Sequence, residues 1–233
     1  MFKHKKIIII AGLTIAALAV ITITVFIIKG NGTRPSQMSI NVPYTSQAPA
    51  GDWSEPWQNA CEETSIYMVS SFYANDPIKR DAAIKNIKNI LAVKKQDFKV
   101  SKDESLAEIA ALIKALGFPW STKIVDDPTP EQLKQELSLN RPIIVPVYAP
   151  TLGQTDGANY HVMVLIGYDD ATQTFIVNDP GVTNGQNRHF PYATFMQAIH
   201  DLNQKNYQAG QPAVLFTEQS DWTSWFAEFS GTP

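Results

Sequence analysis

The feature that most constrains this 233-residue chain is an uncharged apolar run near its N-terminus. Residues 7–28 contain no charged side chain, whereas three lysines precede them and Lys29 follows. A helix of this length spans roughly 33 Å at about 1.5 Å per residue, which is enough to cross a bilayer. The apolar part of a cleaved signal peptide is shorter, about 7 to 15 residues, and ends at a small-residue cleavage site. We therefore predict an uncleaved transmembrane signal-anchor within residues 1–29, with a cleaved signal as the alternative.

The charges around this run predict on which side of the membrane the rest of the chain lies. Lys3, Lys5 and Lys6 favour a cytoplasmic N-terminus, which places the C-terminal domain outside. Beyond residue 29 the chain has 15 basic against 22 acidic residues, a net charge of −7. Nucleic-acid binding requires a basic surface, so we expect no nucleic-acid partner. We predict a single-pass cell-membrane protein with an extracytoplasmic domain.

Composition divides the chain into four segments. The stretch GNGTRPSQ, which follows the anchor, is small and polar, as is typical of a short spacer. Trp222, Trp225 and Phe226 make the C-terminal tail aromatic. The predicted segments are the cytoplasmic flank with its anchor (1–29), a linker (30–39), a folded domain (40–218) and the tail (219–233).

The folded domain is predicted to contain helices followed by an antiparallel sheet. Apolar residues at three- and four-residue spacing predict helices near 79–92, 104–116, 129–139 and 191–202, besides one that begins near Cys61. Short β-branched or aromatic segments between turn residues predict strands at 143–148, 161–168, 174–178 and 213–217. This segregation favours an α+β fold over a doubly wound α/β fold. The lysine-rich stretch 79–99 is interpreted as a solvated helix face.

Cys61 is the single cysteine of a chain that we expect to be exported. Exported domains usually pair their cysteines as disulfides, so a lone one is either a free thiol or an intermolecular link. The residues around it predict a helix start, with Asn59 as the cap and Glu62 at the reciprocal position. Cys61 would then lie in the first helical turn. There its pKa, ordinarily about 8.5, can fall if an imidazolium lies beside it.

Three histidines could serve as the base for such a thiol, because His4 lies in the cytoplasmic flank. His200 falls within a predicted helix, where a packing role is the better interpretation, and His189 lies in a polar connection. His161 opens the apolar strand HVMVLIGY, which would hold its ring on a rigid element.

The register of the next hairpin predicts a carboxylate partner for this histidine. If the turn centres near residues 170–171, position 161 faces positions 179–181 across the two strands. Asp179 would then hold the imidazole in one tautomer, whereas Asn178 fits the register less well. Taken alone, Asp179-Pro180-Gly181 is also a common turn sequence.

Four stretches of this chain resemble the papain-like cysteine peptidases of family thirty-nine. They are VPYTSQAP (42–49), CEETS from residue 61, HVMVLIGYD (161–169) and VNDPG (177–181). The resemblance covers roughly residues 40–217. It implies a papain-like fold, with helices packed on an antiparallel sheet, and a Cys-His-Asp triad. The best known members of the family trim leader peptides after a pair of glycines, usually within exporters.

The resemblance also implies a role for each residue. Cys61 would be the nucleophile, His161 the general base and later acid, and Asp179 the group that orients the imidazole. A glutamine that precedes the cysteine would donate to the oxyanion. Gln47 in VPYTSQ matches that motif best, and Gln58 remains its rival because an apparent insertion separates the two.

One departure from the family pattern concerns the strength of the nucleophile. Relatives commonly carry Gly-Pro after the cysteine, whereas this chain has Glu62 and Glu63. Two carboxylates favour a helix start but oppose a neighbouring thiolate. A non-hydrolytic module that binds peptides or wall material in the same groove is therefore an alternative to an active peptidase.

The leading hypothesis is a membrane-anchored, extracytoplasmic thiol hydrolase that cleaves peptide bonds in a peptide or protein substrate. A cell-wall peptide hydrolase or acyl transferase is a second enzyme alternative, since the wall is the polymer nearest to an anchored domain. Neither HExxH nor CxxC nor a phosphate-binding loop occurs, so we predict no metal and no cofactor. Trp53 and Trp57 could line a groove beside Cys61, although packing roles are more common for tryptophan.

Overall fold

The computed structural model describes residues 34–98, 103–154 and 159–220. The predicted anchor (7–28) and the aromatic residues Trp222, Trp225 and Phe226 lie outside these ranges. Within them, no helix combines the length and the apolar character that crossing a bilayer requires.

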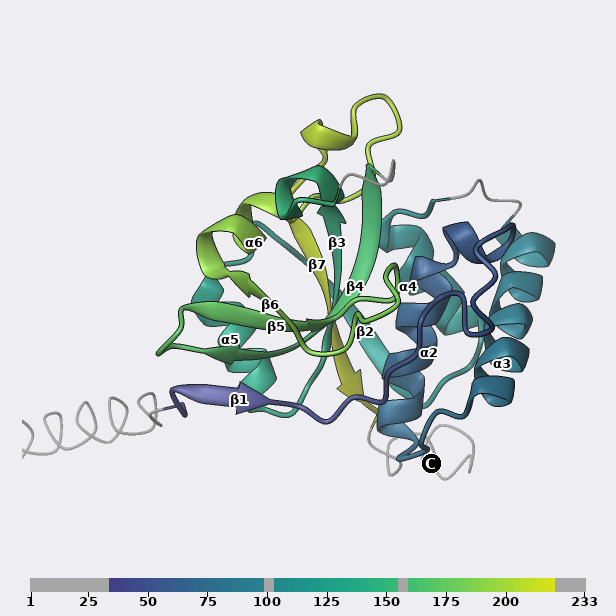
Figure 1. Ribbon diagram of the computed structural model, residues 1–233, viewed down its shortest axis with the longest axis horizontal. Helices are drawn as coiled ribbons and strands as arrows, with labels where there is room; N and C mark the ends of the chain where they lie inside the picture. The colour runs from purple at the N-terminus through teal and green to yellow at the C-terminus, as the bar shows by residue number, and fades with distance from the viewer. Residues whose placement is uncertain (1–33, 99–102, 155–158, 221–233) are drawn as a thin grey trace, which may run out of the picture. The chain divides into compact units, whose positions relative to one another are not determined.

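The chain forms an α+β fold (Figure 1). Its α-helices are α2 (Cys61–Tyr73), α3 (Arg80–Val93), α4 (Leu106–Ala115), α5 (Pro130–Ser138) and α6 (Tyr192–Ala198). Short helical turns are η1 (Trp57–Asn59), η2 (Lys94–Phe98), η3 (Ala149–Leu152) and η4 (Tyr207–Ala209). The strands are β1 (Gln37–Ser39), β2 (Trp120–Asp126), β3 (Ile143–Tyr148), β4 (Tyr160–Asp169), β5 (Thr174–Asn178), β6 (Arg188–Pro191) and β7 (Ala213–Gln219).

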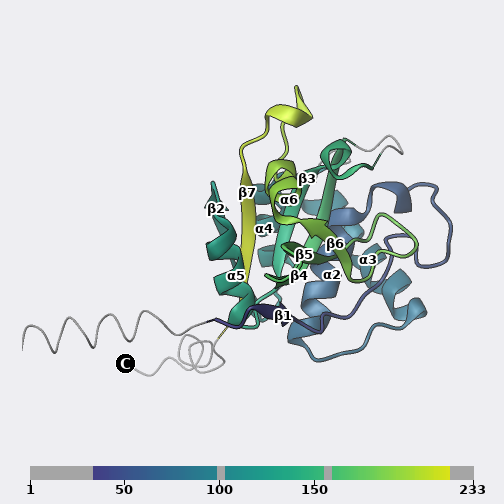
Figure 2. The same ribbon diagram turned by 60° about the vertical axis from the view of Figure 1, so that its left-hand side comes forward.

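The seven strands in the described part of the chain belong to one antiparallel sheet, which confirms the predicted fold class. The order is β2-β7-β3-β4-β5-β6, and β1 pairs with the end of β4. Figure 2 shows β2 and β7 side by side at one edge of this sheet. β4 is central and is buried from Tyr160 to Tyr168, because β3, β1 and β5 flank it and helices cover it. A side chain at the start of β4 therefore has a fixed position.

The predicted strands are confirmed as β3, β4, β5 and β7, whereas β1, β2 and β6 were not predicted. Because β2 precedes α5, the predicted order of helices first and strands afterwards is wrong. β2 and β6 lie at the two ends of the main strand order and carry exposed polar residues such as Lys123 and His189. Edge strands often carry charge, which weakens the apolar alternation by which strands are recognised.

The predicted helices are present, and two of them begin with reciprocal capping pairs. Ser105 pairs with Glu108 at the start of α4, and Thr129 with Gln132 at the start of α5. The predicted Asn59 cap of α2 is wrong. Since η1 runs directly into α2, the cap position falls on Ala60, and Asn59 Nδ2 donates instead to the Glu55 carboxylate at 2.6 Å.

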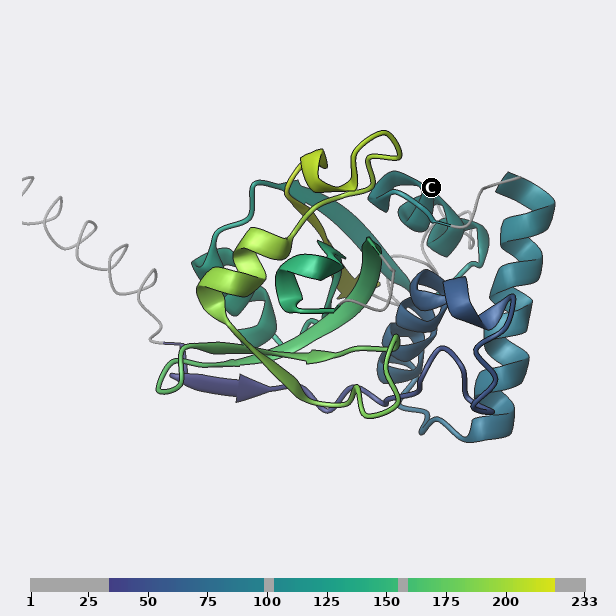
Figure 3. The ribbon, with the colours of Figure 1, turned by 45° about the horizontal axis from the view of Figure 1, so that its top comes forward.

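The helices form layers on the sheet. α2 packs on β4 and α3 packs outside α2, whereas α5 and α6 lie on the other side (Figures 1 and 3). Ser65 Oγ on α2 donates to the Val162 carbonyl on β4 at 3.3 Å. Ser65 lies one helical turn after Cys61, and Val162 directly follows His161. The hydrogen bond therefore fixes the start of α2 against the start of β4.

A buried ionic cluster joins α2 to two later segments. Lys94 Nζ lies 2.8 Å from Glu63 Oε1 and 2.5 Å from Glu104 Oε1. The Glu104 amide donates to Glu62 Oε1 at 3.2 Å. All four side chains are buried, so the interpretation of the 79–99 lysines as a solvated face is wrong for Lys94. The reason is helical periodicity, because Lys94 continues the buried face of α3 that contains Ala83, Ile87 and Ile90.

We expect the thermal unfolding midpoint to fall as the pH rises from about 5 to about 9. Burial, followed by neighbouring carboxylates, raises the pKa of Glu62 to about 7 and that of Glu104 to about 9. Because the unfolded values are about 4.3, the folded state binds more protons over this window and loses stability as they dissociate. Circular dichroism of the full chain would measure the midpoint. Glu104→Gln should flatten the profile, and a midpoint that rises with pH would contradict the expectation.

Candidate active site

Cys61 is the first residue of α2, and its side chain is almost fully buried. The thiol donates to the Glu62 Oε2 atom at 3.1 Å. Burial raises the pKa of Cys61 well above its ordinary value, the Glu62 carboxylate raises it further, and a hydrogen bond with the Val162 backbone opposes both. Both the burial and the neighbouring carboxylate therefore favour the neutral thiol at this helix N-terminus.

His161 and Asp179 lie together, as the hairpin register predicted. Val164 pairs with Asn178 and Leu165 with Val177, so the end of β5 reaches the start of β4. The Nε2 atom of His161 lies 2.6 Å from the Asp179 Oδ1 atom. Asn178, the less favoured position, instead donates from Nδ2 to the Val42 carbonyl at 3.0 Å.

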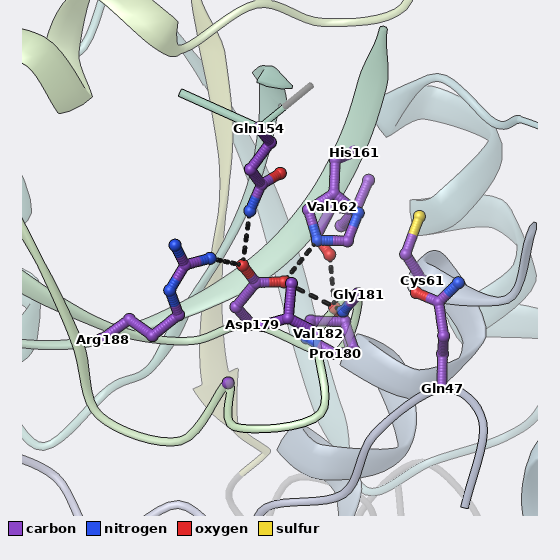
Figure 4. A network of polar contacts seen from close by, with 12 residues as sticks. Gln47, Cys61, Gln154, His161, Val162, Asp179, Pro180, Gly181, Val182 and Arg188 are labelled. Carbon is purple, nitrogen blue, oxygen red and sulfur yellow. Dashed lines mark hydrogen bonds and ion pairs between the residues drawn. The ribbon is translucent and has the colours of Figure 1, made fainter. Parts of the chain in front are cut away.

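The Asp179 carboxylate is fully buried, and donors surround it (Figure 4). Its Oδ1 atom also accepts from the Gly181 amide at 2.9 Å, and its Oδ2 atom accepts from Gln154 Nε2 at 2.7 Å and from Arg188 Nη1. Burial alone would raise the pKa of Asp179. The charge and hydrogen bond of His161, together with Gly181 and Arg188, lower it to about 2. The group is thus ionised throughout the neutral range.

The imidazole has a second nitrogen besides the one that binds Asp179. Because Nε2 binds Asp179, the remaining nitrogen is Nδ1, and Figure 4 shows it on the side of the ring where the sulfur lies. Among the described residues the thiol hydrogen goes to Glu62, not to His161.

Cys61 and His161 open into a pocket of about 500 Å³. Its lining is largely polar and includes Gln47, Trp53, Gln58, Asn59, Asp103, Gln154, Asn159, Tyr160, Gly181 and Tyr207. A second pocket of about 410 Å³ lies beside Tyr44, Ser46 and Arg80, and Trp53 lines both. Trp53 therefore fits the predicted groove role, whereas Trp57 is buried.

The two candidate glutamines differ in how they are held. Gln47 is buried, its backbone amide donates to the Pro180 carbonyl at 2.9 Å, and its Nε2 donates to the Trp57 carbonyl at 2.9 Å. An amide nitrogen carries two hydrogens, so one remains to serve a ligand. Gln58 is exposed, and its Nε2 donates to the Glu55 carboxylate at 2.8 Å.

Three residues that hold the carboxylate of Asp179 were not predicted from the sequence, namely Arg188, Gln154 and Gly181. Arg188 faces Val177 across β5 and β6, so a correct prediction of β6 would have placed it near Asp179. Gln154 follows η3, and no pattern in its stretch indicated a contact with Asp179. In the described part of the chain, no group of three His, Cys, Asp or Glu side chains is arranged to hold a metal ion.

Comparison with known proteins gives a family match and similar solved structures. The sequence model of the Peptidase_C39 like family matches residues 39–210. A crystal structure assigned as a C39-like peptidase from Bacillus anthracis matches with a TM-score of 0.51 and 18% identity, over 79% of this chain and 99% of that one. Xylellain, a cysteine protease from Xylella fastidiosa, matches with a TM-score of 0.43 and 12% identity, over 81% and 88% of the two chains. Among curated proteins, no sequence matches significantly.

Gly181→Ala should displace the His161 ring. An added Cβ would lie 2.6 Å from Cε1 and 2.9 Å from Nε2 of His161, closer than packed atoms approach. We expect a loss of about 1 to 3 kcal/mol in unfolding free energy. We also expect a change in the NMR signal of the proton shared by His161 and Asp179. Thr183→Ala, in the same loop, is the control and should alter neither. An unchanged signal in Gly181→Ala would contradict the geometry.

Asp179→Asn should remove the contribution that the ionised Asp179 carboxylate makes to folding stability, a contribution that wild type loses in acid. The folded pKa of about 2 lies below the ordinary 3.8, so the ionised group stabilises the fold above about pH 4. We expect the difference in unfolding free energy between wild type and variant to shrink by about 2 kcal/mol between pH 5 and pH 2. Urea unfolding of the full chain measures this. Asp81→Asn, an exposed control, should differ little from wild type, and a pH-independent effect of Asp179→Asn would contradict the assignment.

Proposed function

The chain belongs to the Peptidase_C39 like family, and from this premise we propose that it is a cysteine peptidase with Cys61, His161 and Asp179 as its catalytic triad. The observation that carries the proposal is the 2.6 Å contact between His161 and Asp179 at the wall of a pocket that Cys61 also lines. A nucleophile, a base and a group that orients the base are the parts that acyl transfer to sulfur requires.

In the proposed reaction, His161 Nδ1 takes the thiol proton, and the sulfur keeps the electron pair that attacks the substrate carbonyl carbon. The imidazolium then returns this proton to the leaving amine as the C–N bond breaks, which leaves a thioester on Cys61. Water, deprotonated by His161, attacks the thioester carbonyl carbon. The C–S bond then breaks, the acid product leaves, and the imidazolium returns the proton to the Cys61 sulfur. Asp179 keeps its negative charge throughout and fixes the ring through Nε2.

Gln47 is the proposed donor to the oxyanion. Its amide is held by the Trp57 carbonyl in a buried position next to Cys61 (Figure 4), and one Nε2 hydrogen is left for the substrate oxygen. A donor fixed before the reaction costs no reorganisation when negative charge develops. Gln58 is exposed and bound to Glu55, so it supports this role less well.

The proposed location follows from the N-terminal run, which would anchor the peptidase domain on the outer side of the cell membrane. Its substrates would then be peptides or proteins at the cell surface. A hydrolase or acyl transferase that acts on wall peptides uses the same thioester intermediate and differs in the substrate and in the acceptor. Comparing the products from a peptide library with those from purified wall material separates these two.

A non-hydrolytic binding module is the second candidate, because the Cys61 thiol donates to Glu62 and its pKa is raised. Such a module would bind peptides in the same pocket without forming a thioester. A mass-spectrometric search for a covalent adduct between Cys61 and a peptide aldehyde discriminates the two. An enzyme forms the adduct, and a binding module does not.

Peptide hydrolysis by the full chain should disappear in Cys61→Ala. Gln47→Ala should lower kcat by about 100- to 1,000-fold, because it removes an oxyanion donor, and Gln58→Ala should lower it less than about three-fold. Steady-state kinetics on a peptide found by library screening measures these effects. Equal turnover by Cys61→Ala and wild type would exclude Cys61 as the nucleophile. A larger loss of kcat in Gln58→Ala than in Gln47→Ala would assign the oxyanion role to Gln58.

A further inference from the structure

Glu62 is a buried carboxyl group that the proposed reaction does not use. It follows Cys61 on α2 and has no exposed surface. Its Oε2 atom accepts the thiol hydrogen of Cys61 at 3.1 Å, and its Oε1 atom accepts the Glu104 amide at 3.2 Å. The carboxyl group is thus held at both oxygens, so its position beside the sulfur is fixed and not one of several exposed rotamers.

A thiol has a single hydrogen, and two acceptors compete for it here. One is Glu62, which holds it, and the other is His161, whose Nδ1 atom lies on the side of the sulfur. Only transfer to His161 produces the thiolate and imidazolium pair that can attack a carbonyl carbon. While Glu62 is ionised, a thiolate would be a second negative charge beside it in a buried site, which is unfavourable.

We propose that Glu62 is a positioning residue that holds the Cys61 thiol protonated in the resting protein and so sets how readily its hydrogen passes to His161. The proposal rests on the proposed function, because it concerns the same nucleophile. In the step that releases the thiol, the S–H bond breaks, an N–H bond forms at His161 Nδ1, and the electron pair stays on sulfur. Glu62 loses one hydrogen bond and gains or loses no proton.

The charge of Glu62 depends on groups from every element packed against it. Glu63 follows it on α2, Lys94 comes from the end of α3, and Glu104 comes from the segment before α4, where Asp103 acts on Glu63. Tyr160 lies beside it on β4. Lys94 contacts Glu63 and Glu104 directly, whereas the oxygens of Glu62 are bound to the thiol and to a backbone amide.

The test measures thiol reactivity and needs no peptide substrate. The full chain is alkylated with iodoacetamide between pH 5 and pH 10, and Cys61 is its single cysteine, so every adduct reports on this site. We expect Glu62→Gln to react about ten-fold faster than wild type near pH 8.5, where Glu62 with its pKa of about 7 is ionised, and we expect its reactivity profile to move about one pH unit lower. Glu63→Gln is the matched control. It removes the same charge from the next residue without touching the sulfur, and we expect less than a three-fold change.

Two results of the alkylation experiment would overturn the proposal. Slower alkylation of Glu62→Gln would overturn the proposal, because it would make Glu62 an aid to thiolate formation. Equal acceleration by both variants would also overturn it, because only the net charge of the cluster would then matter.

If Glu62→Gln does not fold, the infrared S–H band of the wild type serves instead. The proposal requires a band displaced to lower wavenumber than that of a free thiol, and an undisplaced band rejects it. Because no readout involves hydrolysis, a failure of the peptidase assignment stays distinguishable.

Discussion

The docking of α2 against β4 is the constraint on which the rest of this structure depends. Cys61 and His161 are a hundred residues apart in the chain; Cys61 is the first residue of α2 and His161 is the second residue of β4. The hydrogen bond from Ser65 to the Val162 carbonyl lies within a fully buried interface. It fixes the position of the first turn of α2 relative to the start of β4. A slip of one residue along β4 would turn the imidazole to the opposite face of the sheet. The relation between sulfur and imidazole therefore depends on packing in the core more than on the pocket itself.

Asp179 is the second point at which distant segments meet. Its carboxylate accepts hydrogens from His161, Gly181, Gln154 and Arg188, and its backbone amide donates to the Gly185 carbonyl at 2.8 Å. A buried charge is tolerable only when it is bound in this way, because an unpaired one costs several kcal/mol. The loop that carries Asp179 is thereby held rigid on both sides of the residue. The ring of His161 is oriented by a group that cannot easily move.

The sequence was informative where the structure is regular and buried. The apolar strands, the α5 cap at Thr129 and the hairpin register that brings Asp179 to His161 all follow from local rules. β2 and β6 were not predicted, because their polar residues weaken the apolar alternation by which strands are recognised. Arg188 was missed because it belongs to β6. Lys94 could have been recognised as buried from its helical spacing to Ile87 and Ile90. The inward direction of Glu62 could not be predicted, since it depends on Glu104 from a distant segment.

The hydrogen bond between Cys61 and Glu62 has a consequence for the chemical durability of the protein. Oxidants such as hydrogen peroxide attack the thiolate, and the first product, a sulfenic acid, leads to irreversible forms. A sulfur that rests as a buried, neutral thiol presents little of the reactive species to such agents. By holding the thiol hydrogen, the neighbouring carboxylate thus also protects the proposed nucleophile against oxidation.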